Sequence, residues 1–430
     1  MGFEDIATLT LRNNKRSLQV NINEFVKKLK ESKEKYTKSS YTKARAKISP
    51  SLFVELNNRL IKSYYEDKED IKFYKEFRVF AIDGSIIQLP NVESISLKTQ
   101  SKEKRMKQEL RDIYGCSSNK KSQYGTIARV SILEDIENNI IHQGIFNSYY
   151  ASEKDMAIEH IKYLDKLKKE SSIEYKDLIL FDRGYPSYTL LMLLESKNID
   201  YIIRMPKKRF KEIDEFRENS KEKDKIITLT LTKEKLSDIR KNNRYHKFIK
   251  DKKVGDKIVI RAIKVELPSK ETEILITSLV DKKKYKTTLF KSLYFKRWRV
   301  EEEYKAIKAL MQVENFTGIT QIALNQDFFA TIFMLNMTNL LINAAYEEKI
   351  KEFNKSKKRK YKYKINRSFS IGIIKDEFIY LVVNEGDIEA FYFSILEAIS
   401  TNLTPIKPNR SFSRKRKGRH KYPTYQKGNI

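Results

Sequence analysis

Cysteine is almost absent from this chain, and histidine is rare. Cys116 is the only cysteine among 430 residues, so the chain can form no internal disulfide and no site built from several thiolates. The histidines lie far apart and lack the spacing of metal ligands, which argues against a zinc site of His and Cys; they are His142, His160, His246 and His420. These absences are typical of a reducing compartment, and we expect a cytoplasmic location.

Glycine is also scarce, with only 12 residues, and neither G-x-x-x-x-G-K nor G-x-G-x-x-G occurs. The chain therefore has no visible loop for nucleotide phosphates, and we expect no small-molecule substrate. The start, residues 1–6, lacks the charged and apolar pattern of a secretion signal. Residues 328–346 are long enough to span a membrane, but Asn336, Asn339 and Asn343 interrupt them. We interpret this run as a buried core helix and expect no membrane partner.

Positive charge is abundant. The chain holds 87 Lys and Arg against 57 Asp and Glu, which gives a formal net charge of +30. A globular protein this basic usually binds a polyanion, because each neutralised phosphate releases condensed counterions. Nucleic acid is therefore the leading partner. The alternative is a lysine-rich proteome with no specific anionic partner.

Residues 294–308, Y-F-K-R-W-R-V-E-E-E-Y-K-A-I-K, carry the most informative pattern. On one helix, Tyr294, Arg297, Glu301 and Lys308 would lie at roughly 0°, 300°, 340° and 320° and so share a face. Such a face could hold a metal ion and phosphate oxygens together. The alternative is a solvated charged helix in which pairs such as Arg297 with Glu301 stabilise the helix by only about 0.2–0.5 kcal/mol each.

Two aspartates that precede this segment in the sequence are associated with apolar, strand-like runs. Asp83 lies within residues 77–89, FRVFAIDGSIIQL, where a buried carboxylate is costly unless it is paired or bound to a cation. The alternative for Asp83 before Gly84 is a turn. Asp182 ends the apolar run of 177–185, DLILFDRGY, and ligands gather at the carboxyl ends of parallel strands. Both aspartates are therefore candidate functional residues.

The predicted order of elements is a strand with Asp83, a hairpin of two strands, a helix, a strand ending at Asp182, a helix and one more strand. This order matches an α/β, ribonuclease H-like catalytic core, in which the final acid comes from a later helix. The segment between Asp182 and Glu301 is too long for a simple connection. Its strand-like runs, 226–232, 258–267 and 273–280, predict a β-rich insertion.

The spacing Y-x2-R-x3-E-x6-K, behind Asp83 and Asp182, resembles the signature of DDE transposases of the bacterial insertion-sequence-four family. T-S-L-V-D at 277–281, R-W-R-V-E at 297–301 and N-F-T-G at 315–318 are similar to that family's usual surroundings. The resemblance implies an enzyme that binds the terminal inverted repeats of its own insertion sequence, cleaves double-stranded DNA and joins the 3′ ends to target DNA. It also implies a homodimer on DNA.

Asp83, Asp182 and Glu301, without histidine or thiolate, select hard cations such as Mg²⁺ or Mn²⁺. Two such ions about 3.5 to 4 Å apart can activate a water or a 3′-hydroxyl and stabilise the leaving oxygen. We expect Asp83 to bridge both ions and the three carboxylates to converge. Arg297 and Lys308 would hold DNA phosphates, with Tyr294 orienting a phosphate or packing beside it.

Two further residues are candidates for DNA contact. Arg183 follows Asp182 and could bind phosphate, although an ion pair within the core is equally plausible. Trp298 could stack on a base or pack in the core; its angle on the predicted helix does not decide between the two, and we expect core packing.

The chain divides into five predicted regions. They are a helical N-terminal module that binds DNA ends or caps the core (1–70), the first part of the catalytic core (71–206), the β-rich insertion (207–285), the second part of the core (286–346) and a basic C-terminal region and tail (347–430). Residues 349–367 hold ten basic residues with Tyr361 and Tyr363 interleaved, which suits phosphate contact. Residues 91–123 are predicted to be a loop or lid, and the tail from Pro405 a flexible arm on the DNA backbone.

Two other functions are compatible with these residues. One is a catalytically inactive, sequence-specific DNA-binding protein derived from a transposase, although its acids are intact. The other is a metal-dependent nuclease that cuts without strand transfer.

Overall fold

The computed structural model describes residues 1–12, 16–29, 33–66, 71–90, 110–116, 125–170, 175–240, 251–266, 271–355, 359–383 and 387–407. Most of the predicted lid, 91–123, and most of the predicted arm from Pro405 lie outside the described residues.

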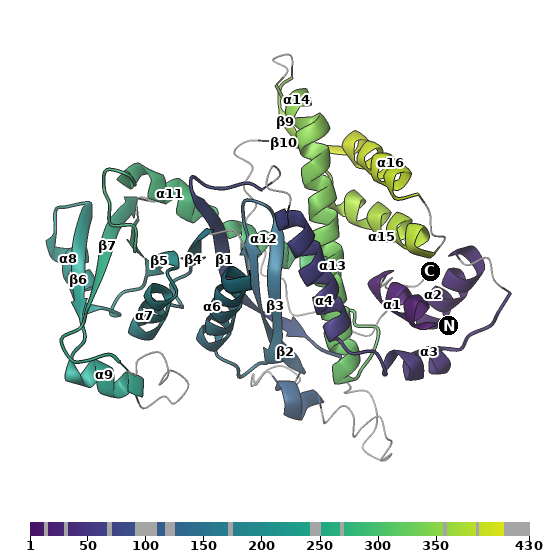
Figure 1. Ribbon diagram of the computed structural model, residues 1–430, viewed down its shortest axis with the longest axis horizontal. Coiled ribbons are helices and arrows are strands. Elements are labelled where there is room, and N and C mark those ends of the chain that lie inside the picture. The colour runs from purple at the N-terminus through teal and green to yellow at the C-terminus, as the bar shows by residue number, and fades with distance from the viewer. Residues whose placement is uncertain are drawn as a thin grey trace.

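Within the described residues, a mixed sheet of eight strands runs through the centre of the chain in the order β3-β2-β1-β4-β5-β8-β7-β6 (Figure 1). The strands are β1 (Phe77–Gln88), β2 (Ile127–Asp135), β3 (Ile140–Ser148), β4 (Lys176–Phe181), β5 (Asp200–Met205), β6 (Asp224–Thr230), β7 (Lys257–Glu266) and β8 (Thr272–Thr277). β1 and β4 are parallel, as are β4 and β5, while the other neighbours are antiparallel. The carboxyl end of β4 therefore lies beside Ala81, in the middle of β1 and two residues before Asp83.

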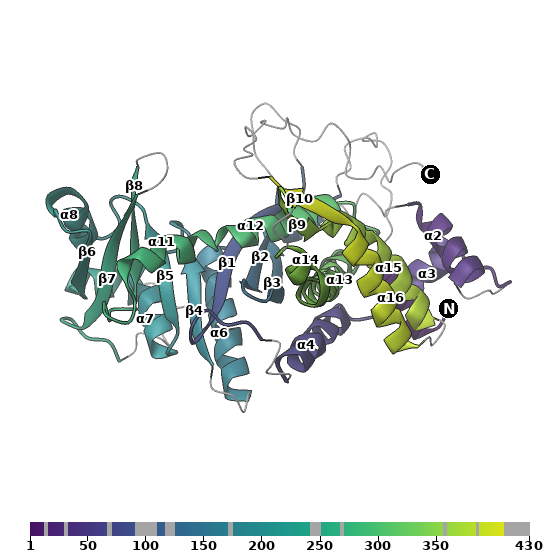
Figure 2. The same ribbon diagram turned by 90° about the horizontal axis from the view of Figure 1, so that it is seen from above.

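Helices cover both faces of this sheet. They include α6 (Glu153–Glu170), α7 (Tyr188–Ser196), α11 (Thr287–Phe295) and α12 (Trp298–Lys305). Figure 2 shows α6 and α7 on one side and α11 and α12 on the other. Because successive strand residues point to opposite faces, Ile82 belongs to the core on the α6 side and Ala81 to the core on the other side. Asp83 therefore follows on the α12 side of β1, and Gly84 on the α6 side.

The order β1, β2, β3, α6, β4, α7, β5 confirms the predicted ribonuclease H-like core. Asp182 comes directly after Phe181, the last residue of β4. The hairpin between β2 and β3 turns within the predicted residues 134–139. The apolar, β-branched composition of these strands explains why they were recognisable, since each strand is buried by helices or by a neighbouring strand.

The three strands predicted for the insertion extend the same sheet, because β8 pairs with β5. The insertion also holds α8 (Lys211–Asn219) and α9 (Lys233–Arg240). Arg261 on β7 is fully buried and binds Asp224 through Nε at 2.9 Å. Arg261 Nη1 donates to the carbonyl oxygens of Leu279 at 3.2 Å and Tyr285 at 2.6 Å, just before α11. The insertion thus anchors the start of the segment that carries the signature.

A long helix, α13 (Gln321–Ala345), forms the core of the layer beside β3. In the described part of the chain, Gln321–Phe353 is one helix long and apolar enough to cross a membrane, and 67% of its most apolar window is buried inside the protein. Asn336, which interrupts the apolar run, donates to Asn57 Oδ1 at 2.7 Å and accepts from the Ile141 amide at 2.8 Å. The interpretation of residues 328–346 as a buried core helix is confirmed.

The N-terminal helices pack onto this layer. They are α1 (Phe3–Arg12), α2 (Leu18–Glu24), α3 (Lys38–Arg45) and α4 (Ser51–Glu66), with a π-helical turn at Phe25–Leu29 after α2. α4 lies against α13, and α1 lies against α13 and α15 (Arg367–Val383). This packing suits a cap on the core, and a role in binding DNA ends stays a prediction.

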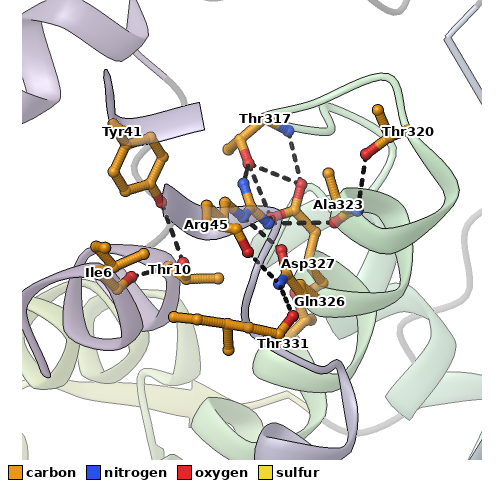
Figure 3. Close-up of polar contacts among 11 residues, drawn as sticks. Ile6, Thr10, Tyr41, Arg45, Thr317, Thr320, Ala323, Gln326, Asp327 and Thr331 are labelled. Carbon is orange, nitrogen blue, oxygen red and sulfur yellow. Dashed lines mark hydrogen bonds and ion pairs between the residues drawn. The ribbon is translucent and has the colours of Figure 1, made fainter. Parts of the chain in front are cut away.

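Arg45 joins α3 to α13 in a buried polar cluster (Figure 3). Its Nη2 donates to Asp327 Oδ1 at 2.7 Å and its Nε to Gln326 Oε1 at 2.7 Å. Asp327 Oδ2 also accepts from the backbone amide of Thr317 at 2.7 Å. The cluster therefore links the N-terminal helices to the loop that follows the signature segment.

The C-terminal region folds back beside α13. It contains a π-helical turn at Tyr346–Ile350, α14 (Lys351–Phe353), β9 (Lys362–Ile365), α15, α16 (Ile388–Thr401) and β10 (Leu403–Ile406). β9 and β10 form a separate antiparallel pair. Lys362 and Lys364 on β9 are exposed, so part of the basic run at 349–367 faces solvent.

Candidate active site

The signature segment is broken into three pieces, so the expectation of one regular helix was wrong. α11 ends at Phe295, and the amides of Lys296 and Arg297 bond to the carbonyls three residues earlier, in a tight turn before α12. Lys308 lies on a π-helical turn, Ala306–Leu310, that continues α12. Arg297 itself keeps right-handed helical angles, φ −53° and ψ −29°, so the chain direction is preserved across the turn.

Asp83 lies on β1, with α12 packed against that strand. Its Oδ1 accepts from the Gly84 amide at 3.0 Å, and its carbonyl oxygen accepts from the Tyr304 hydroxyl at 2.8 Å. Burial raises the pKa of Asp83 to about 6; Arg297 opposes the rise, and the charges of Glu301 and Asp182 add to it. The three predicted acids therefore lie in one electrostatic environment.

Asp182 lies at the carboxyl end of β4, and its Oδ1 is buried without a hydrogen-bond partner. The nearest cation is Arg204 on β5, whose Nη1 lies 4.0 Å from that oxygen. Arg204 is in turn paired with Glu273 on β8. Asp182 thus keeps an unused acceptor directed into the site.

Glu301 is paired with Arg297, whose Nη2 lies 3.0 Å from Glu301 Oε1. Arg297 is only 4% exposed and packs over the Tyr294 ring at 5.9 Å. Its Nε is buried without a hydrogen-bond partner. The Tyr294 hydroxyl donates to the Phe181 carbonyl at 3.4 Å, so Tyr294 packs against the end of β4 and supports Arg297.

Lys308 bonds to the carboxyl end of β1. Its Nζ donates to Ser85 Oγ at 2.8 Å and to the Ile86 carbonyl at 2.7 Å. Burial lowers the pKa of Lys308, and Glu314 opposes this shift. As it lies, Lys308 fastens the π-helical turn to the strand that carries Asp83.

Trp298 and Arg183 are placed outside the core. Trp298 is 49% exposed and stacks on the ring of Phe295, with the centroids 6.3 Å apart, so the preference for core packing was wrong. The reason is the tight turn that precedes α12. This turn makes Trp298 the first residue of α12 and leaves its side chain beside the exposed Phe295. Arg183 is exposed beside Asp182, which rules out the alternative of an ion pair within the core.

Two residues near Asp83 and Asp182 were not predicted. Tyr304, three residues after Glu301, lies on the inner face of α12 and fixes the backbone of β1. Its spacing of three residues from Glu301 places the two side chains on neighbouring positions of one helix face, so the sequence could have identified it. Arg204 is the penultimate residue of β5, next to β4, and strand order alone would have placed it near Asp182.

The donor set fits a hard divalent cation. It consists of carboxylates, the oxygen ligands that such cations prefer. The Asp182 carboxylate has a buried oxygen with no hydrogen-bond partner. The pKa of Asp83 is raised, and a bound cation would lower it again. The expectation that the three carboxylates converge was wrong for the side chains as they lie: in the described ranges, no three Asp, Glu, His or Cys residues are gathered closely enough to hold an ion. Glu301 is held by Arg297, so a cation would compete with that guanidinium for it.

The raised pKa of Asp83 predicts that Asp83→Asn stabilises the protein in metal-free buffer. Ionised Asp83 is disfavoured in the folded chain, so the contribution of Asp83 to wild-type stability is fully present below its ordinary pKa of 3.8 and is lost as the pH rises through about 6. We expect the melting temperature of Asp83→Asn to exceed that of the wild type at pH 8. The difference should shrink as the pH approaches 4. An unchanged difference across this range would contradict the prediction.

Comparison with known proteins gives one family. No curated protein matches the chain. Among solved structures, a cryo-EM structure of a piggyBac transposase synaptic complex with hairpin DNA is similar at a TM-score of 0.42 and 10% identity, over 96% of this chain and 80% of that chain. Residues 74–337 match the family described as "Transposase DDE domain", a range that includes Asp83, Asp182 and Glu301. Because this match spans more than half of the sequence, the chain belongs to the Transposase DDE domain family.

Proposed function

We propose that this protein is a transposase of the bacterial insertion-sequence-four family. It binds the terminal inverted repeats of its own element, cleaves the DNA backbone and joins the freed 3′ ends to target DNA. The observation that carries the proposal is that Asp83, Asp182 and Glu301 all interact electrostatically with the buried Arg297, beside the carboxyl end of β4. Family membership supports the reaction class, and the Y-x2-R-x3-E-x6-K spacing supports the finer assignment.

Asp83, Asp182 and Glu301 would hold two Mg²⁺ or Mn²⁺ ions. Such ions supply an activated water or 3′-hydroxyl and stabilise the leaving oxygen of an in-line displacement. Tyr304 and Lys308 hold β1 in place, so that the Asp83 carboxylate is presented from a fixed backbone. Arg297 holds the Glu301 carboxylate in an ion pair, and its unpartnered Nε is a donor that a phosphate oxygen can use.

Double-stranded DNA is the proposed partner. The chain is strongly basic, and exposed Arg183 lies next to Asp182, where a phosphate near the reacting bond would pass. Exposed Trp298, stacked on Phe295, offers an aromatic surface for an unpaired base. On this proposal, two copies act together, each on one element end, and the protein works in the bacterial cytoplasm.

The direct test is DNA cleavage. Purified protein with Mg²⁺ should cut a labelled duplex, taken from the DNA flanking its own gene, at the edge of the element and then yield strand-transfer product. Asp83→Ala should bind this duplex without cutting it, because one of the three carboxylates proposed to hold the cations is gone. Asp251→Ala, an exposed aspartate in the insertion, is the matched control and should cut normally.

Other outcomes would point to the remaining functions. Binding without cutting by the wild type would favour a catalytically inactive DNA-binding descendant. Cutting without any strand-transfer product would indicate a nuclease.

A further inference from the structure

A second hydroxyl holds the Asp83 backbone from the side opposite Tyr304. The Asp83 carbonyl accepts from the Tyr304 hydroxyl at 2.8 Å and from Ser131 Oγ at 3.2 Å. Ser131 lies on β2 between Val130 and Ile132, whose side chains belong to the core on the α12 side, so its own side chain points to the α6 side. The peptide that follows Asp83 is therefore held from both faces of the sheet.

The imidazole of His160 supports Ser131 from α6, the helix that covers this side of the sheet (Figure 2). His160 Nε2 lies 3.0 Å from Ser131 Oγ, and His160 Nδ1 lies 2.7 Å from Gln143 Oε1 on β3. Ser131 and His160 are both 0% exposed. A buried chain of three side chains thus leads from β3 and α6 to the Asp83 carbonyl.

The chemistry of these groups sets the direction of the hydrogen bonds. A carbonyl oxygen can only accept, so Ser131 uses its one hydroxyl hydrogen on Asp83. Ser131 Oγ then accepts from His160, which places the imidazole hydrogen on Nε2. Burial lowers the pKa of His160 to about 3, so the ring is neutral at neutral pH and Nδ1 is an acceptor. The Gln143 carboxamide therefore turns its NH₂ group toward Nδ1, an exchange of nitrogen and oxygen that leaves its shape unchanged.

The peptide bond between Asp83 and Gly84 carries this restraint to the carboxylate. A peptide unit is planar, so the Asp83 carbonyl and the Gly84 amide turn together. The Gly84 amide donates to Asp83 Oδ1 at 3.0 Å. By fixing the carbonyl, Ser131 and Tyr304 also fix the donor that orients the Asp83 carboxylate.

We propose that Ser131 and His160 are positioning residues of the active site, which fix the Asp83 carboxylate through the planar peptide that follows it. Gln143 completes the chain by fixing the His160 ring. Without this chain, Tyr304 alone would hold the peptide, and cation binding would bear the entropic cost of ordering the carboxylate. This inference rests on the proposed function, which places the cations at Asp83.

The test is the Mn²⁺ dependence of DNA cleavage by the full-length protein. Ser131→Ala and His160→Met should raise the Mn²⁺ concentration for half-maximal cleavage about tenfold or more, the scale found when a group that orients a metal ligand is removed. Saturating Mn²⁺ should restore most of the cleavage rate, because the three acids remain. His160→Gln keeps a donor toward Ser131 and should restore most of the Mn²⁺ affinity.

His142→Met is the matched control. His142 on β3 is also buried, at 2% exposed, but its Nε2 lies 3.1 Å from the Tyr65 hydroxyl, away from Asp83. This variant should lower the melting temperature, as His160→Met does, and leave the Mn²⁺ dependence of cleavage unchanged. Equal shifts of the Mn²⁺ dependence in both variants would trace the effect to lost stability and overturn the inference.

The tautomer of His160 gives a measurement that does not depend on cleavage. In protein labelled with ¹⁵N-histidine, the His160 signals, identified by their loss in His160→Gln, should show the hydrogen on Nε2. A hydrogen on Nδ1 would mean that Ser131 donates to His160 instead of Asp83. The chain would then end short of the active site, and the inference would fail.

These outcomes separate the inference from the proposed function. Cleavage by the wild type, with the same Mn²⁺ dependence in Ser131→Ala and His160→Met, would refute the positioning role alone. Absence of cleavage by the wild type would refute the proposed function, and the positioning role with it.

Discussion

Glu301→Gln is expected to abolish DNA cleavage while leaving DNA binding almost unchanged. Glutamine keeps the shape of the side chain and an acceptor for Arg297, whose Nη2 lies 3.0 Å from Glu301 Oε1. It removes the negative charge that a divalent cation needs. The rate should fall by about 10³-fold or more, the scale on which enzymes lose activity when an essential group is removed. Binding depends mainly on the +30 net charge and should persist.

Glu302→Gln is the matched control, because Glu302 is the next residue of α12 and is exposed. It should cut at the wild-type rate. If Glu302→Gln lost activity and Glu301→Gln kept it, the catalytic glutamate of the signature would be Glu302 and not Glu301. Loss of both cleavage and binding in Glu301→Gln, with a lowered melting temperature, would instead make Glu301 a structural partner of Arg297.

Local patterns in the sequence were sufficient for the core strands and their order. Residues 177–181 form an apolar run that ends in Asp182, and such a run reads as a buried strand whatever surrounds it. The helical spacing of Tyr294, Arg297 and Glu301 gave their common direction correctly. It did not give their depth: Tyr294 and Arg297 are buried, because α11 and α12 lie flat on the sheet.

Contacts between distant segments could not be predicted in this way. The pairing of β5 with β8 makes the insertion part of the central sheet, and no local pattern specifies which strands pair. α8 was missed because its charged residues hide two buried positions, Ile213 and Phe216. The approach of Glu153 to Gly84 depends on how α6 packs, so only a three-dimensional structure reveals it.

Arg45→Met is expected to destabilise the protein by about 3–5 kcal/mol, the cost of leaving a buried charge without its partner. The Arg45 and Asp327 side chains are 5% and 0% exposed, and their ion pair spans 2.7 Å. Arg59→Met is the matched control: its ion pair with Glu55 is on the surface and should contribute less than about 1 kcal/mol. Urea denaturation followed by circular dichroism would measure both changes.

The double variant Arg45→Met/Asp327→Leu tests the cause of this loss. If the cost comes from the unpaired Asp327 carboxylate, replacing that carboxylate should recover most of the stability. Recovery would be incomplete, because Asp327 Oδ2 also accepts from the Thr317 amide at 2.7 Å. If Arg45→Met were as mild as Arg59→Met, or the double variant were no better than the single one, the ion pair would not be what joins α3 to α13. Because Thr317 follows the signature segment, recovered stability with reduced cleavage would further indicate that this loop helps to position Glu301.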